Sequence, residues 1–337
     1  MMDLSIPYYE DLTRISNSNI GWFLSKGPAF LHKMLTNPPK EEKNAVLERG
    51  TMIHEYLLQP EEFDKDYVLY NKRRPSSAQQ EKFCQAIASS LEIEPNRAVL
   101  NAYKDTYSIV GKSEEKMLSE GLKIASELKD YIELLKSNDN RKIISDFDSY
   151  MLNRIGETAK NHWAFQWLFK EIPTSMEVHH EFHINWEKYT YYGMVKCKSL
   201  LDYVAFDFKN KRCIIADLKT TQNIWTFEHS IDKYDYLRQL EYYTQAVKWY
   251  LAIEKHEDPS QWKFDRYFIP IDTTGSYEIR VLYVKNKDII TRQSTIDDAL
   301  NKIGWHLVNN KWDHSLEYYK NDGIEQITYK QNFKSDL

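Results

Sequence analysis

Two acids and a base lie close together in the middle of this chain, in two segments rich in β-branched and aromatic residues. A polar turn, Lys209-Asn210-Lys211, separates these segments, so the stretch predicts a β-hairpin. Asp202 lies eight residues before Asn210 and Asp217 lies seven after it, which places the two carboxylates opposite one another to within one residue. Lys219 is predicted to share a face with Asp217, because strand side chains repeat every second position.

Directly opposed like charges are unfavourable in a hairpin, so an enclosed pair of carboxylates needs a shared proton or a bound cation. Carboxylate oxygens suit Mg²⁺, which generates hydroxide and offsets charge on the phosphorane-like transition state of phosphodiester hydrolysis. A nearby lysine can position or deprotonate the attacking water. The hairpin therefore predicts a site for metal-dependent phosphodiester hydrolysis.

These residues also carry a family resemblance. Asp202, followed by Asp217-Leu218-Lys219, resembles the PD-(D/E)xK nuclease signature, and Gln239 with Tyr243 matches the QxxxY helix motif of its RecB-like branch. A D-x-K string alone arises often by chance, whereas the three motifs in order, on strand, strand and helix, are considerably more specific. The resemblance implies that the glutamine and the tyrosine face the metal centre and the nucleic acid.

A second part of the resemblance lies nearer the N-terminus, where the segment from Gly50 to Phe63 is GTMIHEYLLQPEEF. It is similar to the G-x-x-x-H-x-x-L-L-x-P-x-x-F segment of exonuclease VIII (RecE)-type phage and prophage nucleases, which are lambda-exonuclease-like. Taken alone, His54 fits a hydrogen-bonded core histidine on the apolar side of a helix. The resemblance, from about Ile15 to about Tyr243, implies instead that His54 completes the metal site with the two hairpin acids.

A strand-like segment, MEVHHEFHINWEKYTYYG, precedes the hairpin. Alternation predicts His179, Glu181 and His183 on one face and His180 and Phe182 on the other. This pattern suits a transition-metal cluster, a further acid at the nuclease centre, or a plain polar strand face, and spacing alone favours the last.

The resemblance gives one of these residues a role. In the family, a strand that carries a glutamate and a tryptophan precedes the paired acids. Glu181 matches this glutamate through the segment EFHINW, although Glu177 and Glu187 are near enough that the match could fall on either of them instead. The resemblance also implies that the Leu218 backbone carbonyl helps to ligate the metal. Residues at the start of the match are candidates for phosphate contacts: Arg14, Ser16 and Ser18.

The elements around the site begin with an N-terminal helix. Apolar residues recur at helical spacing after Ser16 and Ser18, either of which is a plausible N-cap. A second helix is expected from Glu41 to Phe63, broken near Pro60, and Gly50 within it indicates a close backbone approach. Residues 71–173 predict an α-helical insertion that could wall a substrate channel, including an amphipathic helix after Ser113 and a basic segment, Lys72-Arg73-Arg74.

Further elements follow the first hairpin. A helix is expected from about Lys233 to about Ile253, with Gln239 and Tyr243 one turn apart on one face. FDRYFIPID and YEIRVLYV predict a second hairpin, and a helix over 294–308 is expected to open on a capping-box-like Ser294-x-x-Asp297. The aromatic tail suits either docking on the body of the protein or assembly.

Composition limits the alternatives. The 337 residues are 42% hydrophobic and 28% charged, with a net charge of −5, so the chain can bury a sizeable core but is not a general polyanion binder. Three cysteines without metal-ligand spacing fit a reducing compartment and are too few for the four-cysteine iron–sulfur site of some relatives. We find no signal-peptide pattern, membrane-length apolar run or Walker A loop, so the expected location is cytoplasmic, in a bacterial or phage-infected cell, and ATP-driven unwinding is not encoded.

The expected fold is α+β and restriction-endonuclease-like, with a mixed central β-sheet flanked by helices. We expect a mainly helical part over 1–175 that contributes His54, a PD-(D/E)xK nuclease core over 176–310 and a C-terminal tail over 311–337. The expected function is Mg²⁺-dependent hydrolysis of DNA, with Mn²⁺ as a substitute. Asp202, Asp217 and His54 would ligate the metal, Lys219 would orient or activate water, and Glu181 would support the site.

The resemblance also implies the finer features of an exonuclease. These are 5′-to-3′ digestion of duplex DNA that leaves 3′ single strands for recombination, a homo-oligomeric ring, and a single-strand annealing protein as partner. Two alternatives stay open: a structure-specific or single-strand endonuclease of the same fold, and a catalytically inactive DNA-binding scaffold. The complete set of Asp202, Asp217 and Lys219 argues against the scaffold.

Overall fold

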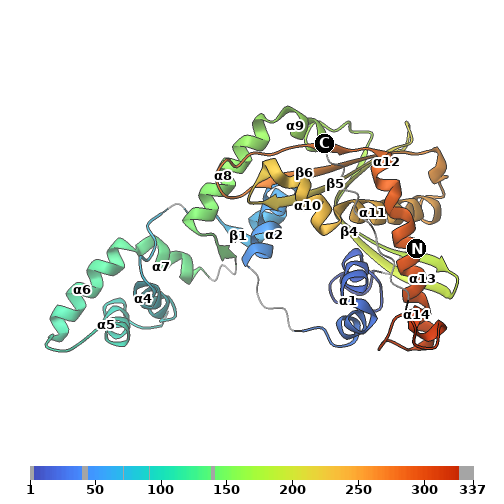
Figure 1. Cartoon of the computed structure of the whole chain (residues 1–337). Coiled ribbons are helices and arrows are strands. Elements are labelled where there is room, and N and C mark those ends of the chain that lie inside the picture. Colours follow the sequence, from blue (N-terminus) through green and yellow to red (C-terminus); the bar gives the residue numbers. More distant parts are fainter. Residues whose placement is uncertain (1–3, 40–44, 71, 91, 138–140, 326–337) are drawn as a thin grey trace, which may run out of the picture. The chain divides into compact units, whose positions relative to one another are not determined.

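The computed structural model describes residues 4–39, 45–70, 72–90, 92–137 and 141–325. The chain forms two compact units, one from residues 1–59 and 154–337 and the other from residues 60–153 (Figure 1). The first unit therefore includes much of the expected N-terminal part, because residues 1–59 fold with the sheet rather than with the helices that follow them.

A five-stranded mixed sheet forms the centre of the first unit, in the order β3-β4-β5-β6-β7. Strands β5 and β6 are parallel, and the other neighbouring pairs are antiparallel. This sheet, with its flanking helices, confirms the expected α+β fold class and the expected mixed central sheet. The strands are β3 (Glu177–Thr190), β4 (Gly193–Asp207), β5 (Arg212–Thr221), β6 (Lys263–Asp272) and β7 (Leu282–Val284).

The hairpin predicted at the centre of the chain is β4 and β5. Its ladder ends at the pair Tyr203 and Ala216, and continuing this register by one residue places Asp202 opposite Asp217. In the turn, Asp207 accepts hydrogen bonds from the backbone and the side-chain amide of Asn210. The expected alignment of the two carboxylates is therefore confirmed.

Helices of the first unit pack on this sheet. In α11, Leu240, Val247 and Leu251 are buried in the main core, as expected. Helix α8 (Asp146–Asn161) crosses from the second unit into the first. The other helices of the first unit are α1 (Asn17–Thr36), α2 (Ala45–Leu58), α9 (Trp163–Phe169), α10 (Phe227–Tyr234), α11 (Tyr236–Ile253), α12 (Asn286–Ile289), α13 (Gln293–Asn309) and α14 (Leu316–Lys320).

Three local expectations were wrong. The helix predicted from about Lys233 is broken, because Asp235 adopts a left-handed conformation with φ 50° between α10 and α11. Helix α13 begins directly after a 3₁₀ turn with Arg292 at its N-cap, so Ser294 lies inside the helix and forms no capping box. A Cβ added at Gly50 would meet only the Thr220 Oγ1 at 3.8 Å, an ordinary contact, so this glycine does not mark a close backbone approach.

Strand β3 also departs from simple alternation. Glu181 has φ 45°, although its neighbours His180 and Phe182 keep a continuous register with β4. As a result, His179 stacks on Phe182 with ring centroids 4.3 Å apart, where regular alternation would place these two residues on opposite faces. The expected division of this strand into two faces is therefore wrong on the N-terminal side of Glu181.

The second unit contains much of the helical insertion expected over 71–173, whereas residues 154–173 fold in the first unit. The second unit has its own core around Phe83, Tyr103 and Ile132. The basic segment Lys72-Arg73-Arg74 forms ion pairs within this unit, with Asp130, Glu127 and Asp146 in turn. Its positive charge is therefore largely matched by local acids. The elements are α3 (Pro60–Asp66), β1 (Tyr67–Val68), α4 (Ala78–Ala88), α5 (Pro95–Thr106), α6 (Glu114–Glu127), α7 (Lys129–Lys136) and β2 (Lys142–Ile143).

The described part of the C-terminal tail docks on the first unit. Trp312 is buried and stacks against His32 of α1 and His306 of α13. Residues 326–337 of the predicted tail lie outside the described residues. Among the helices that the structure describes, none is long and apolar enough to cross a membrane.

Candidate active site

Three predicted site residues from three different elements converge in the first unit. One ligand atom each of His54 (α2), Glu181 (β3) and Asp202 (β4) lies within 4.8 Å of the others. The sheet register brings Glu181 and Asp202 together, because they lie opposite one another on neighbouring strands. Helix α2 adds the imidazole, and its last turn is held where the Lys170 Nζ donates to the Leu57 carbonyl at 3.0 Å.

Asp202 lies where β4 and β5 stop pairing. Its Oδ2 accepts the backbone N–H of Leu218 at 2.7 Å, two residues beyond Ala216, the last residue of β5 that pairs with β4. The same oxygen lies 3.8 Å from the Nδ1 of His54. One carboxylate thus connects the backbone of β5 to the imidazole of α2.

Asp217 is fully buried beside this cluster and is held on both oxygens. Its Oδ2 forms an ion pair with the Lys219 Nζ at 2.6 Å. Its Oδ1 accepts a hydrogen bond from the Gln239 Nε2 at 3.0 Å, and the same nitrogen lies 2.8 Å from the Tyr243 Oη. The structure therefore brings the D-x-K strand and the QxxxY helix into direct contact.

Burial raises the pKa of all three acids of the site. The pKa of Asp217 is about 6, because desolvation and the repulsion of Asp202 outweigh the attraction of Lys219. The pKa of Glu181 is about 7, raised by burial and then by Asp202, Glu55 and Asp217. Burial also raises the pKa of Asp202, against the opposing effects of Lys219 and the Leu218 amide. Without a cation, this site disfavours its own negative charge.

The pKa values of the two basic groups shift in opposite directions. Burial, followed by repulsion from Lys219, lowers the pKa of His54 to about 4, so its imidazole is neutral at pH 7 and has a lone pair for a metal. Burial acts to lower the pKa of Lys219, but the attraction of Asp217 and Asp202 outweighs it, and the net shift is upward. Lys219 is therefore a fixed ammonium that can orient an oxygen, not a free amine that can take a proton.

The residues fit a divalent cation. Carboxylate oxygens from Asp202 and Glu181, with the neutral imidazole of His54, are ligand types that Mg²⁺ and Mn²⁺ accept, the oxygens most readily. The Asp217 carboxylate lies beside this group, with its oxygens engaged by Lys219 and Gln239. The ammonium of Lys219 faces acids whose pKa values are raised by burial and, for Glu181 and Asp217, also by the charge of Asp202. A cation at this position would remove that repulsion.

The transition-metal cluster considered for strand β3 does not form. His179 Nε2 lies 2.7 Å from Glu177 Oε1, and Glu177 also pairs with Lys255. His183 Nε2 lies 2.9 Å from Asn185 Oδ1. Of the glutamates near this register, Glu181 is the one that joins His54 and Asp202 among the described residues.

The predicted phosphate-contact residues lie just before helix α1 and in its first turn. Arg14 pairs with Asp11, with its Nε 3.1 Å from Oδ2. Ser16 is buried and caps α1, where it exchanges hydrogen bonds with Asn19. Ser18 is exposed on the first turn of α1. The capping role predicted for Ser16 is confirmed, and phosphate contacts by these residues stay a prediction.

Two residues at the site were missed from sequence. The Tyr236 ring centroid lies 5.1 Å from the Lys219 Nζ, and the Glu55 carboxylate helps to raise the pKa of Glu181. A signal existed for each: Tyr236 is three residues before Gln239 and so shares its helix face, and Glu55 follows His54 directly.

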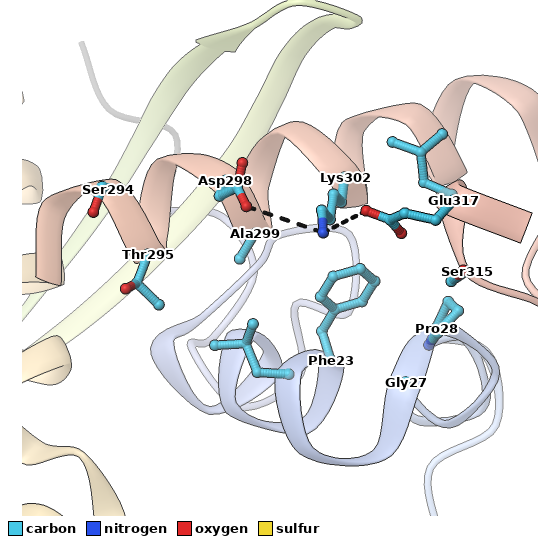
Figure 2. A pocket seen from close by; sticks show the side chains of 12 residues that line it. Phe23, Gly27, Pro28, Ser294, Thr295, Asp298, Ala299, Lys302, Ser315 and Glu317 are labelled. Atoms are coloured by element: carbon cyan, nitrogen blue, oxygen red, sulfur yellow. Dashed lines mark ion pairs between the residues drawn. The ribbon is translucent and has the colours of Figure 1, made fainter. Parts of the chain in front are cut away.

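A hollow of about 510 Å³ lies elsewhere in the first unit, between α1, α13 and α14 (Figure 2). It is lined by Phe23, by the backbone kink at Gly27, and by Lys302, which pairs with Glu317 at 2.6 Å and with Asp298 at 4.0 Å. The predicted site residues do not line it. The chemistry of the acidic cluster is thus separate from this hollow.

Comparisons with known proteins add little detail. No family model matches this chain, and no curated protein matches it. The chain is similar to a solved structure from Eubacterium rectale described as a "Putative exonuclease", at 12% identity and a TM-score of 0.48, with 100% of each chain covered. The case for a function therefore rests on the geometry of the site.

Proposed function

We propose that this protein is a metal-dependent deoxyribonuclease that hydrolyses phosphodiester bonds, and specifically an exonuclease that digests duplex DNA from 5′ ends. The observation that carries the proposal is the convergence of His54, Glu181 and Asp202 within 4.8 Å, beside the Asp217–Lys219 pair. A set of acids that repel one another around a neutral imidazole favours a hard divalent cation. Phosphodiester hydrolysis is the reaction that such a cation beside a fixed ammonium suits best.

Each residue has a role in this proposal. Asp202, Asp217, His54 and the Leu218 carbonyl would hold Mg²⁺ or Mn²⁺, which when bound lowers the pKa of water and offsets negative charge on the phosphoryl group. Lys219 would orient the attacking water or a phosphate oxygen through its ammonium.

The remaining groups support the metal ligands and the substrate. Glu181, within 4.8 Å of His54 and Asp202, would support the site as a further carboxylate and accept a hydrogen bond from the attacking water. Gln239 holds Asp217 Oδ1, and its contact with the Tyr243 Oη fixes the amide in turn. These two residues would keep the carboxylate in one orientation and contact the scissile strand.

The biological context is part of the proposal and comes from the sequence resemblance. We propose that the 3′ single strands serve recombination in a bacterial or phage-infected cell, with a homo-oligomeric ring for processive digestion and a single-strand annealing protein as partner. The matched charge of Lys72-Arg73-Arg74 leaves that segment a weak candidate for holding DNA.

The test is digestion of linear and closed circular duplex DNA by the purified full chain with Mg²⁺ or Mn²⁺. The proposal predicts nucleotide release from the linear duplex alone, with loss of a 5′ label before a 3′ label, and comparison of 5′-phosphorylated and unphosphorylated ends defines the preferred terminus. Cleavage of the closed circle would support the endonuclease alternative. Binding without any release would support the inactive scaffold.

A further inference from the structure

The corner between α10 and α11 lies beside Lys219 of the site, because Tyr236, the first residue of α11, has its ring centroid 5.1 Å from the Lys219 Nζ. Asp235, at φ 50° and ψ 51°, separates the two helices, although left-handed backbone is uncommon for a residue other than glycine. Its carboxylate is held by two arginines, with Oδ1 2.7 Å from the Arg292 Nε and Oδ2 3.2 Å from the Arg238 Nε. The corner is therefore fixed from two sides.

This corner brings two tyrosine rings face to face. Tyr234 and Tyr236 have ring centroids 5.5 Å apart and an interplanar angle of 29°. In a continuous helix, residues two positions apart point in different directions and cannot stack. The left-handed Asp235 is what allows this stack, which the continuous helix predicted from sequence would not contain.

The two rings lead from the catalytic lysine to solvent. The inner ring, Tyr236, lies 5.1 Å from the Lys219 Nζ and packs against Phe227 and Phe268 in the core. The outer ring, Tyr234, is 53% exposed. The Lys233 Nζ lies 5.1 Å from the centroid of the outer ring.

We propose that Tyr234, supported by Tyr236, is a stacking platform for an unpaired nucleobase of the DNA strand that reaches the site. This inference rests on the proposed function and specifies how the substrate is bound: the unpaired end of one strand of the duplex is held without sequence preference. Bases of every type present a π-face, so an exposed ring accepts any of them. Lys233, beside the same ring, supplies a positive charge for the neighbouring phosphate.

The test measures binding of single-stranded oligonucleotides in EDTA, where no cleavage occurs, by fluorescence anisotropy of the full chain. Tyr234→Ala is expected to weaken binding by about five- to hundredfold, and Tyr234→Phe, which keeps the ring, to bind within about twofold of the original protein. Tyr191→Ala is the matched control, because Tyr191 is 91% exposed on the turn between β3 and β4. Melting temperatures check that each variant folds.

Abasic oligonucleotides separate stacking from other effects. The original protein should bind abasic strands more weakly than normal strands, whereas Tyr234→Ala should bind both kinds of strand equally. The salt dependence of binding should be the same in Tyr234→Ala as in the original protein, because no phosphate contact is lost. Equal affinity of Tyr234→Ala and the original protein, or an equal loss on abasic and normal strands, would overturn the platform. Since the assay needs no hydrolysis, a protein that binds this way and releases no nucleotide would refute the nuclease while sustaining the platform.

Discussion

Glu181 and Asp202 face one another across β3 and β4, and Glu181 holds a left-handed backbone, with φ 45°, at the point of contact. Two carboxylates in this position repel, and the pKa of both is raised, with burial as the largest cause. Backbone strain of this kind persists only where the surroundings hold it, and it is concentrated at functional sites. The pair is thus unfavourable in the metal-free protein and favourable once a cation lies between the two acids.

Replacing Asp217 should separate activity from stability. In Asp217→Asn we expect cleavage to fall by at least about a hundredfold, with a melting temperature unchanged or raised, since a buried carboxylate that is disfavoured by its neighbours becomes neutral. Each 1 kcal/mol of relief corresponds to about 2–4 °C for a protein of this size. Nucleotide release and thermal melts in EDTA measure the two effects.

Asp265→Asn is the matched control, because Asp265 is equally buried on the neighbouring strand β6 and pairs with Arg212 outside the cluster. Loss of that pair should lower the melting temperature and leave cleavage by the folded protein intact. The interpretation fails if Asp217→Asn melts well below the original protein or keeps its activity.

The stability of the metal-free protein should depend on Glu181 as pH rises. A carboxyl with a folded pKa of about 7 binds more protons in the folded than in the unfolded state between its ordinary pKa and pH 7, so its contribution to stability falls across that interval. The melting temperature of Glu181→Gln relative to that of the original protein should therefore rise between pH 5 and pH 8, by less than a fully buried carboxyl would give, because Glu181 keeps contact with solvent, which screens its charge. His54, whose pKa is lowered to about 4, works in the opposite direction in both proteins and cancels in the comparison. A constant difference between the two proteins would contradict the raised pKa.

Divalent cations should stabilise the folded protein through this cluster. A cation at a hundred times its dissociation constant contributes about 2.7 kcal/mol, so Mn²⁺ should raise the melting temperature of the original protein and not that of Asp202→Asn. Glu177→Gln is the control, because Glu177 lies on the same strand and pairs with Lys255 away from the cluster. An equal rise in the melting temperature of Asp202→Asn with Mn²⁺ would show that the metal binds at another site.

Gln239 should act through Asp217 rather than on the metal itself. In Gln239→Ala the Asp217 Oδ1 loses its amide donor, so we expect metal affinity to fall by about 10–100-fold and activity to return at high Mn²⁺ concentration. Tyr243→Phe should have a smaller effect, since the Tyr243 Oη contacts the amide and not the carboxylate. Titration of activity against Mn²⁺ measures this, and a loss in Gln239→Ala that no Mn²⁺ concentration restores would refute the positioning role.

Two helical glycines should respond in opposite directions to alanine. Gly50→Ala should stabilise the protein by about 0.4–1 kcal/mol, because the added Cβ would lie 3.8 Å from the Thr220 Oγ1 and the unfolded chain would lose freedom. Gly304→Ala should destabilise it by about 1–3 kcal/mol, because the Cβ would lie 2.8 Å from the Thr190 Oγ1, which is tied to the Gly193 carbonyl. Urea unfolding of both variants measures the difference, and a shared sign would contradict the packing described for one of the two.

The parts of the site that were predicted correctly are those in which sequence spacing alone determines the geometry. Counting from Asn210 aligned Asp202 with Asp217, and one helical turn placed Gln239 beside Tyr243. His54 came from a family resemblance, since nothing in its own helix distinguishes a ligand from a core histidine. The two alignments, by contrast, depend on regular strand and helix periodicity.

The features that escaped prediction depend on irregular backbone or on distant partners. Glu181 and Asp235 adopt left-handed conformations without a glycine or a proline to signal them. At Asp235 two arginines hold the carboxylate, Arg238 one turn further along the chain and Arg292 from a distant part of it. The acids that pair with Lys72-Arg73-Arg74 come from other helices of the second unit, and no local pattern indicates them.

The most direct test is the anomalous scattering of a crystal soaked in Mn²⁺. We predict one strong peak within coordinating distance of the Asp202 carboxylate, the Asp217 carboxylate and the His54 imidazole. A crystal with Mn²⁺ bound elsewhere, or with the His54 ring turned into the hydrocarbon core and away from both aspartates, would contradict the proposed metal centre.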